Sequence, residues 1–129
     1  MDHYQDEPGK FLEAYGRALG AGDLERIAGC WGFPSLVVSD QGAIAVSTPE
    51  QVKEFFAQAV AWYHSQGWVE TRPREWRTEK LSPQLFSVDV FWDTIDQSGR
   101  LFPSDHSRYI LSLVEGRFII RVAISQSSV

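Results

Sequence analysis

The stretch from Ser104 to Ser125 reads SDHSRYILSLVEGRFIIRVAIS and decides the fold. Apolar and polar residues alternate in two runs, which is typical of half-buried β-strands because successive side chains point to opposite faces of a sheet. The link Val114-Glu115-Gly116-Arg117 is short, and Gly116 is free to take a positive φ, so the two strands are predicted to be antiparallel neighbours. This alternation predicts one apolar face, which earlier segments must cover, with these residues on it: Ser107, Tyr109, Leu111, Leu113, Phe118, Ile120, Val122 and Ile124.

The opposite face of the same hairpin is mixed in character. It carries Arg108 and Arg121 beside Ile110, Ile119 and Ala123. Such a face is too apolar for ordinary solvated surface, so it indicates a partner chain. We therefore expect a homodimer joined through the outer face of the sheet.

Two helices are predicted before the first strand. Residues 8–20 place Phe11, Tyr15, Ala18 and Leu19 on one stripe at helical spacing. A break at residues 20–22 is followed by Asp23, a good N-cap for a second helix. That second helix is expected to carry apolar residues at helical spacing up to Trp31 and to stop at residues 32–34. The apolar residues of the second helix are Leu24, Ile27, Ala28 and Trp31.

A short β-hairpin and a third helix come next. Strands over residues 36–38 and 43–46 flank Ser39-Asp40-Gln41-Gly42, which has the composition of a turn. Thr48-Pro49-Glu50-Gln51 then combines a Thr cap, a Pro at the first helical position and a Gln where a capping box requires it. The third helix is expected to end at Gly67.

From Trp68 onward the pattern changes to long strands. Residues 69–80 are polar and contain Pro73, which removes a hydrogen-bond donor and indicates an edge or a bulge. Residues 84–95 alternate, so that one face of this strand is apolar. The apolar residues on that face are Phe86, Val88, Val90 and Trp92.

Composition limits the classes of function. With 129 residues, 43% of them hydrophobic and 22% charged, the chain is expected to form one domain over residues 1–129. A net charge of -5 argues against nucleic-acid binding, which needs a basic surface. No apolar run reaches the ~20 residues of a membrane helix, and the acidic N-terminus lacks a signal-peptide core. With one cysteine, Cys30, and no disulfide, a soluble cytoplasmic protein is predicted.

The order of these elements resembles the nuclear transport factor 2-like superfamily, which includes ketosteroid isomerase, scytalone dehydratase, limonene epoxide hydrolase and the polyketide cyclases. The resemblance covers roughly residues 11–125 and is carried by the first two helices, the capped third helix and the last hairpin. The matching segments are FLEAYGRAL (11–19), AGDL (21–24), TPEQ (48–51), DHSRY (105–109) and EGRF (115–118). It implies an α+β fold: a cone-shaped, curved antiparallel sheet packed against three helices, also called cystatin-like.

The resemblance also implies a cavity between the curved sheet and the helices. An aromatic lining of this kind suits a hydrophobic, ring-bearing ligand. In this chain its walls would be formed by Tyr15, Trp31, Phe33, Phe55, Trp62, Trp92 and Tyr109. The other interpretation is that these rings are simply the core of the domain.

The closest local match within the superfamily is ketosteroid isomerase. That resemblance assigns Asp40 as a base that removes a proton next to a carbonyl group, with Tyr15 and a protonated Asp105 as hydrogen-bond donors to the enolate. Each residue has a structural interpretation as well: Asp40 can simply turn the chain, Tyr15 can belong to the core, and Asp105 can simply open a strand.

Two classes of function therefore stay open. The first is a binding domain that holds an apolar ligand without catalysis. The second is a cofactor-independent isomerase, lyase or cyclase acting on a cyclic carbonyl compound. The two differ in whether Asp40 faces the cavity or the solvent.

Other chemistry-bearing residues give weaker signals. Asp89 is either an acid in the pocket or the partner of Arg108 or Arg121 on the outer face. His64 and His106 could act as bases near neutral pH, and Cys30 is interpreted as structural. The three histidines show no metal-ligand spacing, and no phosphate-binding loop or nucleophile elbow occurs. Neither a metal nor a cofactor is predicted.

Overall fold

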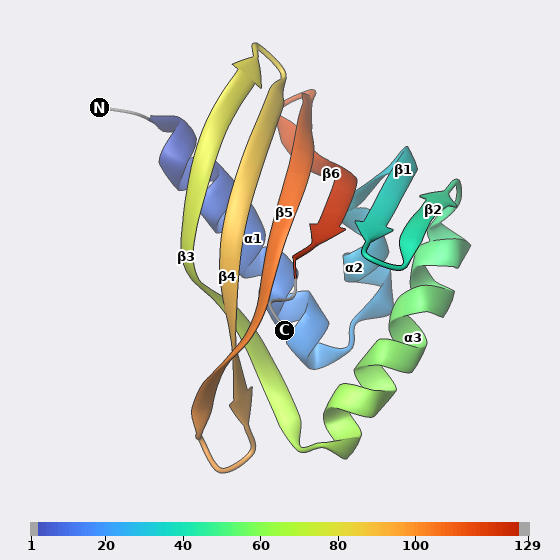
Figure 1. The fold of residues 1–129 in the computed structure, drawn as a ribbon, viewed down its shortest axis with the longest axis vertical. Coiled ribbons are helices and arrows are strands. Elements are labelled where there is room, and N and C mark those ends of the chain that lie inside the picture. Colours follow the sequence, from blue (N-terminus) through green and yellow to red (C-terminus); the bar gives the residue numbers. More distant parts are fainter. Residues whose placement is uncertain (1–2, 127–129) are drawn as a thin grey trace.

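The protein folds as a six-stranded, strongly curved sheet with helices on its inner face (Figure 1). The computed structural model describes residues 3–126, apart from the side chains of residues 3–6 and 102–104. This arrangement confirms the predicted α+β class. Within the described residues the elements are α1 (His3–Ala21), α2 (Leu24–Gly29), β1 (Trp31–Ser39), β2 (Gly42–Val46), α3 (Pro49–Ser65), β3 (Trp68–Ser82), β4 (Leu85–Asp96), β5 (Leu101–Val114) and β6 (Arg117–Ser125).

The strands lie in the order β2-β1-β6-β5-β4-β3. Every neighbouring pair is antiparallel except β1 and β6, which run parallel. The predicted sheet was antiparallel throughout, and this central pair is the exception. The reason is topological, because the chain travels through α3 and three long strands before β6 returns beside β1.

The helices begin and end where side chains cap them. Asp23 accepts a hydrogen bond from the backbone N–H of Arg26 at 3.2 Å, which starts α2. At α3 the Thr48 hydroxyl accepts from the Gln51 N–H at 3.3 Å, and the Gln51 side chain accepts from the Thr48 N–H at 3.2 Å. The capping box predicted at Thr48 is therefore confirmed. Gly67 follows α3 with a φ of +80°, as a helix C-terminus favours.

Trp31 does not extend the second helix, contrary to the prediction from its spacing. α2 ends at Gly29, and Trp31 opens β1, where it pairs with Ile120. The Ile120 N–H donates to the carbonyl oxygen of Cys30 at 2.8 Å. The carbonyl oxygen of Cys30 thus finds its hydrogen-bond donor in β6 and not in a further helical turn. Pairing with the sheet therefore ends α2 before Trp31.

The last hairpin forms as predicted, but one of its strands contains a bulge. Leu111 lies opposite Ile120, whereas Ile110 lies opposite Val122, so β6 has one extra residue at this point. Directly opposed residues share a face. Val122 therefore lies on the outer face with Ile110, and Ala123 lies on the inner face with Tyr109. The predicted alternation is correct up to Ile120 and wrong beyond it.

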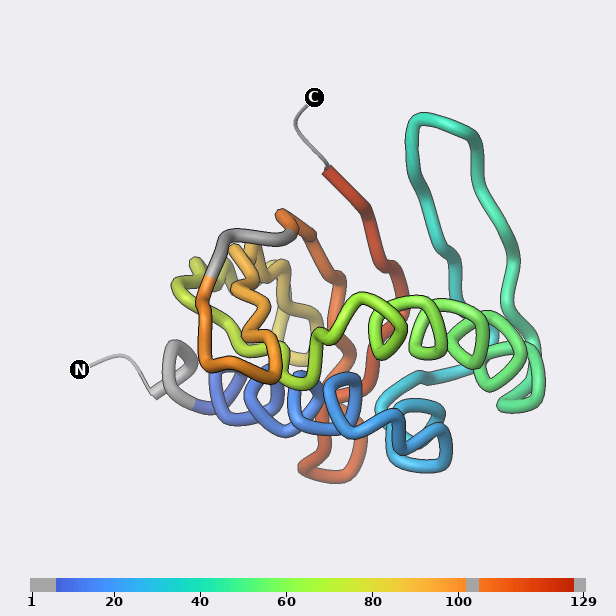
Figure 2. The backbone as a smooth tube through the Cα atoms, turned by 90° about the horizontal axis from the view of Figure 1, so that it is seen from below, coloured from blue at the N-terminus to red at the C-terminus, as the bar shows by residue number. Residues whose placement is uncertain are grey.

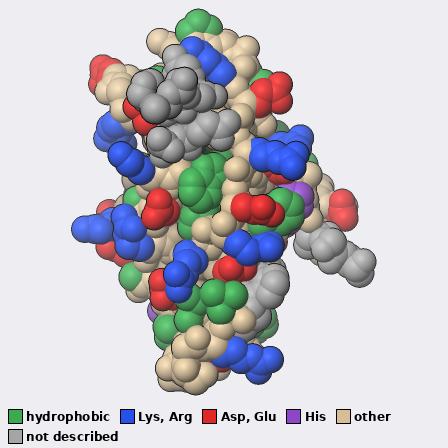
Figure 3. Space-filling view, turned by 90° about the vertical axis from the view of Figure 1, so that its left-hand side faces the viewer, with side chains coloured by type: hydrophobic (Ala, Val, Ile, Leu, Met, Phe, Trp, Pro, Cys, Tyr) green, Lys and Arg blue, Asp and Glu red, His purple; other side chains and the backbone are tan. Residues whose placement is uncertain are grey.

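β3 is an edge strand, as Pro73 indicated, and its pairing with β4 shifts at that residue. Seen from the side on which β3 lies, basic and acidic side chains are interspersed across the surface (Figure 3). Charges and a proline on an exposed edge discourage pairing with another chain. This edge is consequently a poor site for strand addition.

The core lies between α1 and the inner face of the sheet (Figures 1 and 2). The alternation predicted for β4 places Phe86, Val88 and Val90 there with no exposed surface. On α1, Leu12 and Tyr15 contribute the facing side chains. The core is continuous with the wall of a cavity, since Tyr15, Trp92 and Tyr109 belong to both.

Candidate functional site: an aromatic cavity

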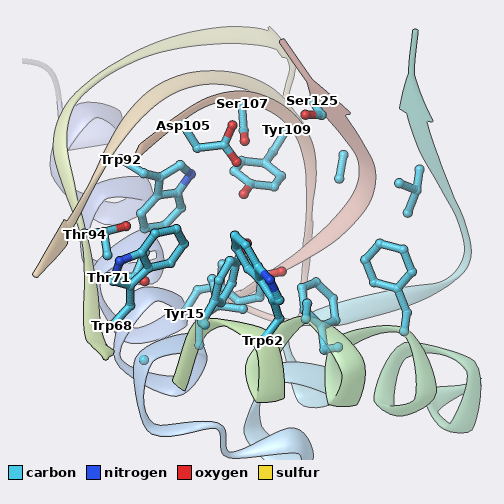
Figure 4. A pocket seen from close by; sticks show the side chains of 18 of the residues that line it. Tyr15, Trp62, Trp68, Thr71, Trp92, Thr94, Asp105, Ser107, Tyr109 and Ser125 are labelled. Atoms are coloured by element: carbon cyan, nitrogen blue, oxygen red, sulfur yellow. The ribbon is translucent and has the colours of Figure 1, made fainter. Parts of the chain in front are cut away.

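A cavity of about 570 Å³ opens between the inner face of the sheet and the helices α1 and α3 (Figure 4). Its volume falls in the range of sites that bind small molecules. Elements far apart in sequence contribute to it, from α1 to β6. Its aromatic lining residues are Tyr15, Trp31, Phe55, Phe56, Trp62, Tyr63, Trp68, Trp92 and Tyr109.

The structure brings most of the predicted wall residues together. Trp31, Phe55, Trp62, Trp92 and Tyr109 all line the cavity. Trp92 and Tyr109 reach it because they lie on the inner faces of β4 and β5. Phe55 and Trp62 come from α3.

Phe33 does not line the cavity, contrary to the prediction. It packs partly buried against the core. β1 loses its regular pairing with β6 between Trp31 and Leu36, so alternation along the strand does not carry through this segment. Val37 lines the cavity instead.

Asp40 lies outside the cavity. It occupies the exposed turn between β1 and β2, where the Gln41 N–H donates to the Ser39 hydroxyl at 3.2 Å. This placement differs from its assignment as a pocket base, because Asp40 is exposed and does not belong to the cavity lining. The turn interpretation, which followed from the composition of residues 39–42, describes the residue correctly.

Tyr15 and Asp105, the other two residues of the predicted triad, do line the same cavity. The Tyr15 ring is 2% exposed, and its hydroxyl accepts a hydrogen bond from the Trp31 indole N–H at 3.2 Å. Burial raises the pKa of Tyr15 well above its usual value, so the hydroxyl keeps its proton. It can donate that proton to a second acceptor.

Asp105 lies on β5 opposite Trp92. Its carboxyl group points toward the Tyr109 ring (Figure 4), and its Oδ1 accepts from the His106 N–H at 3.1 Å. Although the side chain is exposed at the cavity wall, partial loss of surrounding water raises the pKa of the carboxyl group, and His106 opposes this in part. Asp105 is thus an exposed acidic group on the cavity wall.

Tyr109 forms a second tyrosine and tryptophan pair in the wall. Burial raises the pKa of Tyr109 far above its usual value, and hydrogen bonds with Ser107 and Trp92 offset this only in part. The indole N–H of Trp92 can only donate. Like Tyr15, Tyr109 therefore accepts from a tryptophan and retains its own hydroxyl proton.

Sequence reasoning missed several lining residues. Thr94 and Ser107 line the cavity and share strand alternation with Trp92 and Tyr109, so that signal was available. Tyr63 and Trp68 were missed as wall residues. Their rings pack together with centroids 5.5 Å apart where α3 meets β3, a contact that no local pattern shows.

Asp89 belongs to the outer face and not to the cavity. Its Oδ1 lies 2.9 Å from His106 Nε2 and 3.6 Å from Arg108 Nε. Arg121 instead donates to the Ser112 hydroxyl at 3.1 Å and to the Phe33 carbonyl oxygen at 3.2 Å. Of the two alternatives for Asp89, the ion pair with Arg108 is therefore correct.

The remaining candidates lie in ordinary surroundings. His64 lines the cavity, with its Nε2 3.0 Å from the carbonyl oxygen of Gly20. Burial raises the pKa of the Cys30 thiol to about 11, so the thiolate is disfavoured.

In the described part of the chain, no three His, Cys, Asp or Glu side chains gather where they could hold a metal ion. None of the described helices is both long and apolar enough to cross a membrane.

Solved structures with this fold are similar along nearly the whole chain. Aln2 from a Streptomyces species is 13% identical with a TM-score of 0.77, covering 97% of this chain and 91% of its own. An NTF2-like protein with a cystatin-like fold from Novosphingobium aromaticivorans is 10% identical with a TM-score of 0.72, covering 93% and 79%. The association domain of CaMKII from C. elegans is 10% identical with a TM-score of 0.69, covering 96% and 95%.

At these identities the likeness shows the fold alone. No curated protein matches the chain. The family model described as NTF2-like protein (DUF6841) matches residues 6–128. This match agrees with the curved sheet, the helices on its inner face and the resemblance seen in the sequence, and the chain belongs to this NTF2-like family.

Proposed function

We propose that this protein is a small-molecule-binding domain whose cavity holds a hydrophobic, ring-bearing compound. The observation that carries the proposal is the cavity of about 570 Å³ walled by aromatic rings from α1, α3 and the sheet. On α3, Phe55 is 50% exposed and Trp62 is 54% exposed. Large apolar rings beside a cavity gain free energy when a bound molecule covers them.

Binding can be tested with 1-naphthalenemethanol, a neutral ring compound small enough for the cavity. We expect saturable quenching of tryptophan fluorescence. Trp62→Ala should weaken binding about tenfold, because about 1.4 kcal/mol of ring contact is lost. Leu81→Ala is the matched control, since Leu81 is 49% exposed but lies outside the cavity lining. Equal effects of the two substitutions would contradict the proposal.

The alternative function is a cofactor-independent isomerase, lyase or cyclase that transfers a proton on a cyclic carbonyl compound. The observation in its favour is that Tyr15 and Asp105 line one cavity. Asp40 is not available as the base, so Asp105 would take that role while Tyr15 donates to the carbonyl oxygen. The test is hydrogen exchange next to the carbonyl of a cyclic enone in deuterated water. Hydrogen exchange that is lost in Asp105→Asn would favour catalysis. If the unchanged protein causes no exchange, the isomerase alternative is contradicted and the binding function is retained.

We also propose that the chain forms a homodimer through the outer face of the sheet. Ile110, Ile119 and Val122 lie partly exposed on this face. Arg121 on the same face donates to the Ser112 hydroxyl and to the Phe33 carbonyl oxygen, so its guanidinium group is held within the protomer. Similarity to a domain named for association is compatible with this.

Sedimentation equilibrium tests the homodimer. The unchanged protein should sediment as a dimer, and Ile110→Arg should yield a folded monomer because it places a charge in the contact. Leu81→Arg is the control at an exposed position on the edge strand β3, which is not adjacent to β5 or β6, and should leave the dimer intact. A monomeric unchanged protein at tens of micromolar would contradict the proposal.

A further inference from the structure

The charges around the cavity are of one sign. Its lining residues include Glu70 and Asp105, and the lining contains no lysine or arginine among the residues that the structure describes. Glu70 is 51% exposed on its side chain and lies 3.9 Å from the Arg72 Nε. Asp105 has no lysine or arginine partner among its described contacts: its Oδ1 accepts from the backbone N–H of His106, and the charge of His106 lowers its pKa in part against the effect of burial. Of the two carboxylates in the lining, Asp105 is therefore the one that has no lysine or arginine partner among the described residues and that a cationic ligand could neutralise.

Aromatic rings lie beside this carboxylate. Trp92 lies directly opposite Asp105 across the strand pair, and Tyr109 lies beside it on the cavity side of β5 (Figure 4). Across the cavity, Trp62 packs against Trp68 with ring centroids 5.1 Å apart. The faces of such rings carry negative potential and attract cations, most strongly where water is partly excluded.

The groups that face Asp105 from neighbouring elements are few. Tyr63 on α3 is one of them: burial and, to a smaller extent, the charge of Asp105 raise the pKa of the Tyr63 hydroxyl. Tyr109 responds in the same way. His106 contributes its backbone N–H, while its ring is held on the outer face by Asp89. Glu70 and His64 line other parts of the wall. A negative charge at Asp105 thus lies beside neutral rings with no lysine or arginine in the described lining, and a bound cation would pair with it.

We infer that the ligand of this cavity carries a cationic nitrogen, as in a ring-bearing amine or quaternary ammonium compound. The cation is held by the Asp105 carboxylate between the rings of Trp92 and Tyr109. The apolar body of the ligand lies against the rings of α3, Phe55 and Trp62 among them. This inference rests on the proposed binding function and adds the charge class of the ligand.

Three probes with one ring system and three charges test the inference. They are 1-naphthylmethylamine, 1-naphthalenemethanol and 1-naphthoic acid, titrated calorimetrically at pH 7 and physiological salt. The amine should bind at least tenfold more tightly than the alcohol, and the acid should bind most weakly. Asp105→Asn should lower the affinity for the amine to that for the alcohol and change the affinity for the alcohol less than twofold.

Two control variants separate Asp105 from the overall negative charge of -5. Asp40→Asn removes a carboxylate of the same kind from an exposed turn outside the cavity and should change none of the affinities. Glu70→Gln should retain the preference for the amine. If Glu70→Gln abolished the preference and Asp105→Asn did not, the assignment to Asp105 would be overturned.

The pH dependence gives a second measurement. Lowering the pH protonates Asp105, so the affinity for the amine should fall about tenfold while that for the alcohol stays constant. In Asp105→Asn both affinities should be independent of pH wherever the Asp105 carboxyl group titrates in the unchanged protein. Equal binding of amine and alcohol in the unchanged protein would overturn the inference and leave the proposed function standing. Failure of all three probes to bind would contradict both.

Discussion

Tyr15 belongs to the core and to the cavity at once. Its ring stacks with Phe11, with centroids 6.3 Å apart, and meets Tyr109 edge-to-face at 6.1 Å. Its hydroxyl accepts the buried indole N–H of Trp31. The two interpretations offered for this residue from its sequence stripe are therefore compatible, because a core ring can present its polar end to a cavity.

Replacing Tyr15 by Phe should reduce the free energy of unfolding by about 1–2 kcal/mol, since it leaves the Trp31 N–H buried without its acceptor. Urea denaturation measures the change. Trp31→Phe and the double variant complete a double-mutant cycle. We expect a coupling of about 1 kcal/mol between the two positions. Strict additivity would show that the 3.2 Å contact contributes nothing to stability.

Asp105 should make stability depend on pH in the direction opposite to a salt-bridged carboxylate. Its pKa is raised in the folded protein by loss of water, so the unfolded chain ionises at lower pH than the folded chain. The contribution of Asp105 to stability is therefore greatest in acid and is lost as the pH rises from 3.8 through the raised folded value.

Asp105→Asn should consequently stabilise the protein at pH 7, with the gain disappearing below the unfolded pKa. Thermal unfolding of the two proteins, measured from pH 7 down to below the unfolded pKa, gives the difference in stability, with Asp40→Asn as the control. A variant that is less stable than the unchanged protein at pH 7 would indicate that the folded structure favours the carboxylate.

At the scale of elements, α1 lies close against β3 because small residues allow it. A β-carbon added at Gly16 would lie 2.6 Å from the carbonyl oxygen of Thr71 and 3.0 Å from the Trp92 ring. Neither atom can move freely, since one belongs to the backbone and the other to a buried ring. The glycine thus sets the distance between helix and sheet beside the cavity.

Gly16→Ala should therefore destabilise the protein by about 1–3 kcal/mol through overpacking. Gly29→Ala is the matched control in another helix, where an added β-carbon meets nothing within 4 Å. It should be neutral or stabilising by up to about 1 kcal/mol, since alanine is the better helix former. Chemical denaturation of both variants measures the difference, and similar effects would contradict the close packing of α1.

Local signals predicted most elements, and long-range pairing decided the exceptions. The cap at Thr48 and the edge character of the Pro73 segment depend on chemistry within a few residues, and both were predictable. Trp31 was assigned to a helix because its spacing is helical, but its pairing with Ile120 joins segments far apart in the chain. The bulge in β6, which places Val122 on the outer face, leaves no mark in the hydrophobic pattern.

At the scale of the whole molecule, the site is assembled by the curvature of the sheet. Trp92 and Tyr109 were predictable as wall residues because alternation fixes their face. Asp40 was assigned to the cavity by resemblance. The length of the β1–β2 hairpin determines where the turn lies, and it places Asp40 outside the cavity lining. The cluster of Tyr63 and Trp68 required the three-dimensional meeting of α3 and β3.

The tryptophans provide a direct readout of a ring-bearing molecule bound in this cavity. Of the five, Trp31, Trp62, Trp68 and Trp92 line the cavity, whereas Trp76 lies outside the lining and beside Gly9. The measurement is an NMR titration of the indole N–H resonances with 1-naphthalenemethanol. We predict saturable shifts at cavity-lining tryptophans with no shift at Trp76. An absence of shifts at the cavity tryptophans, or equal shifts at Trp76, would contradict the account.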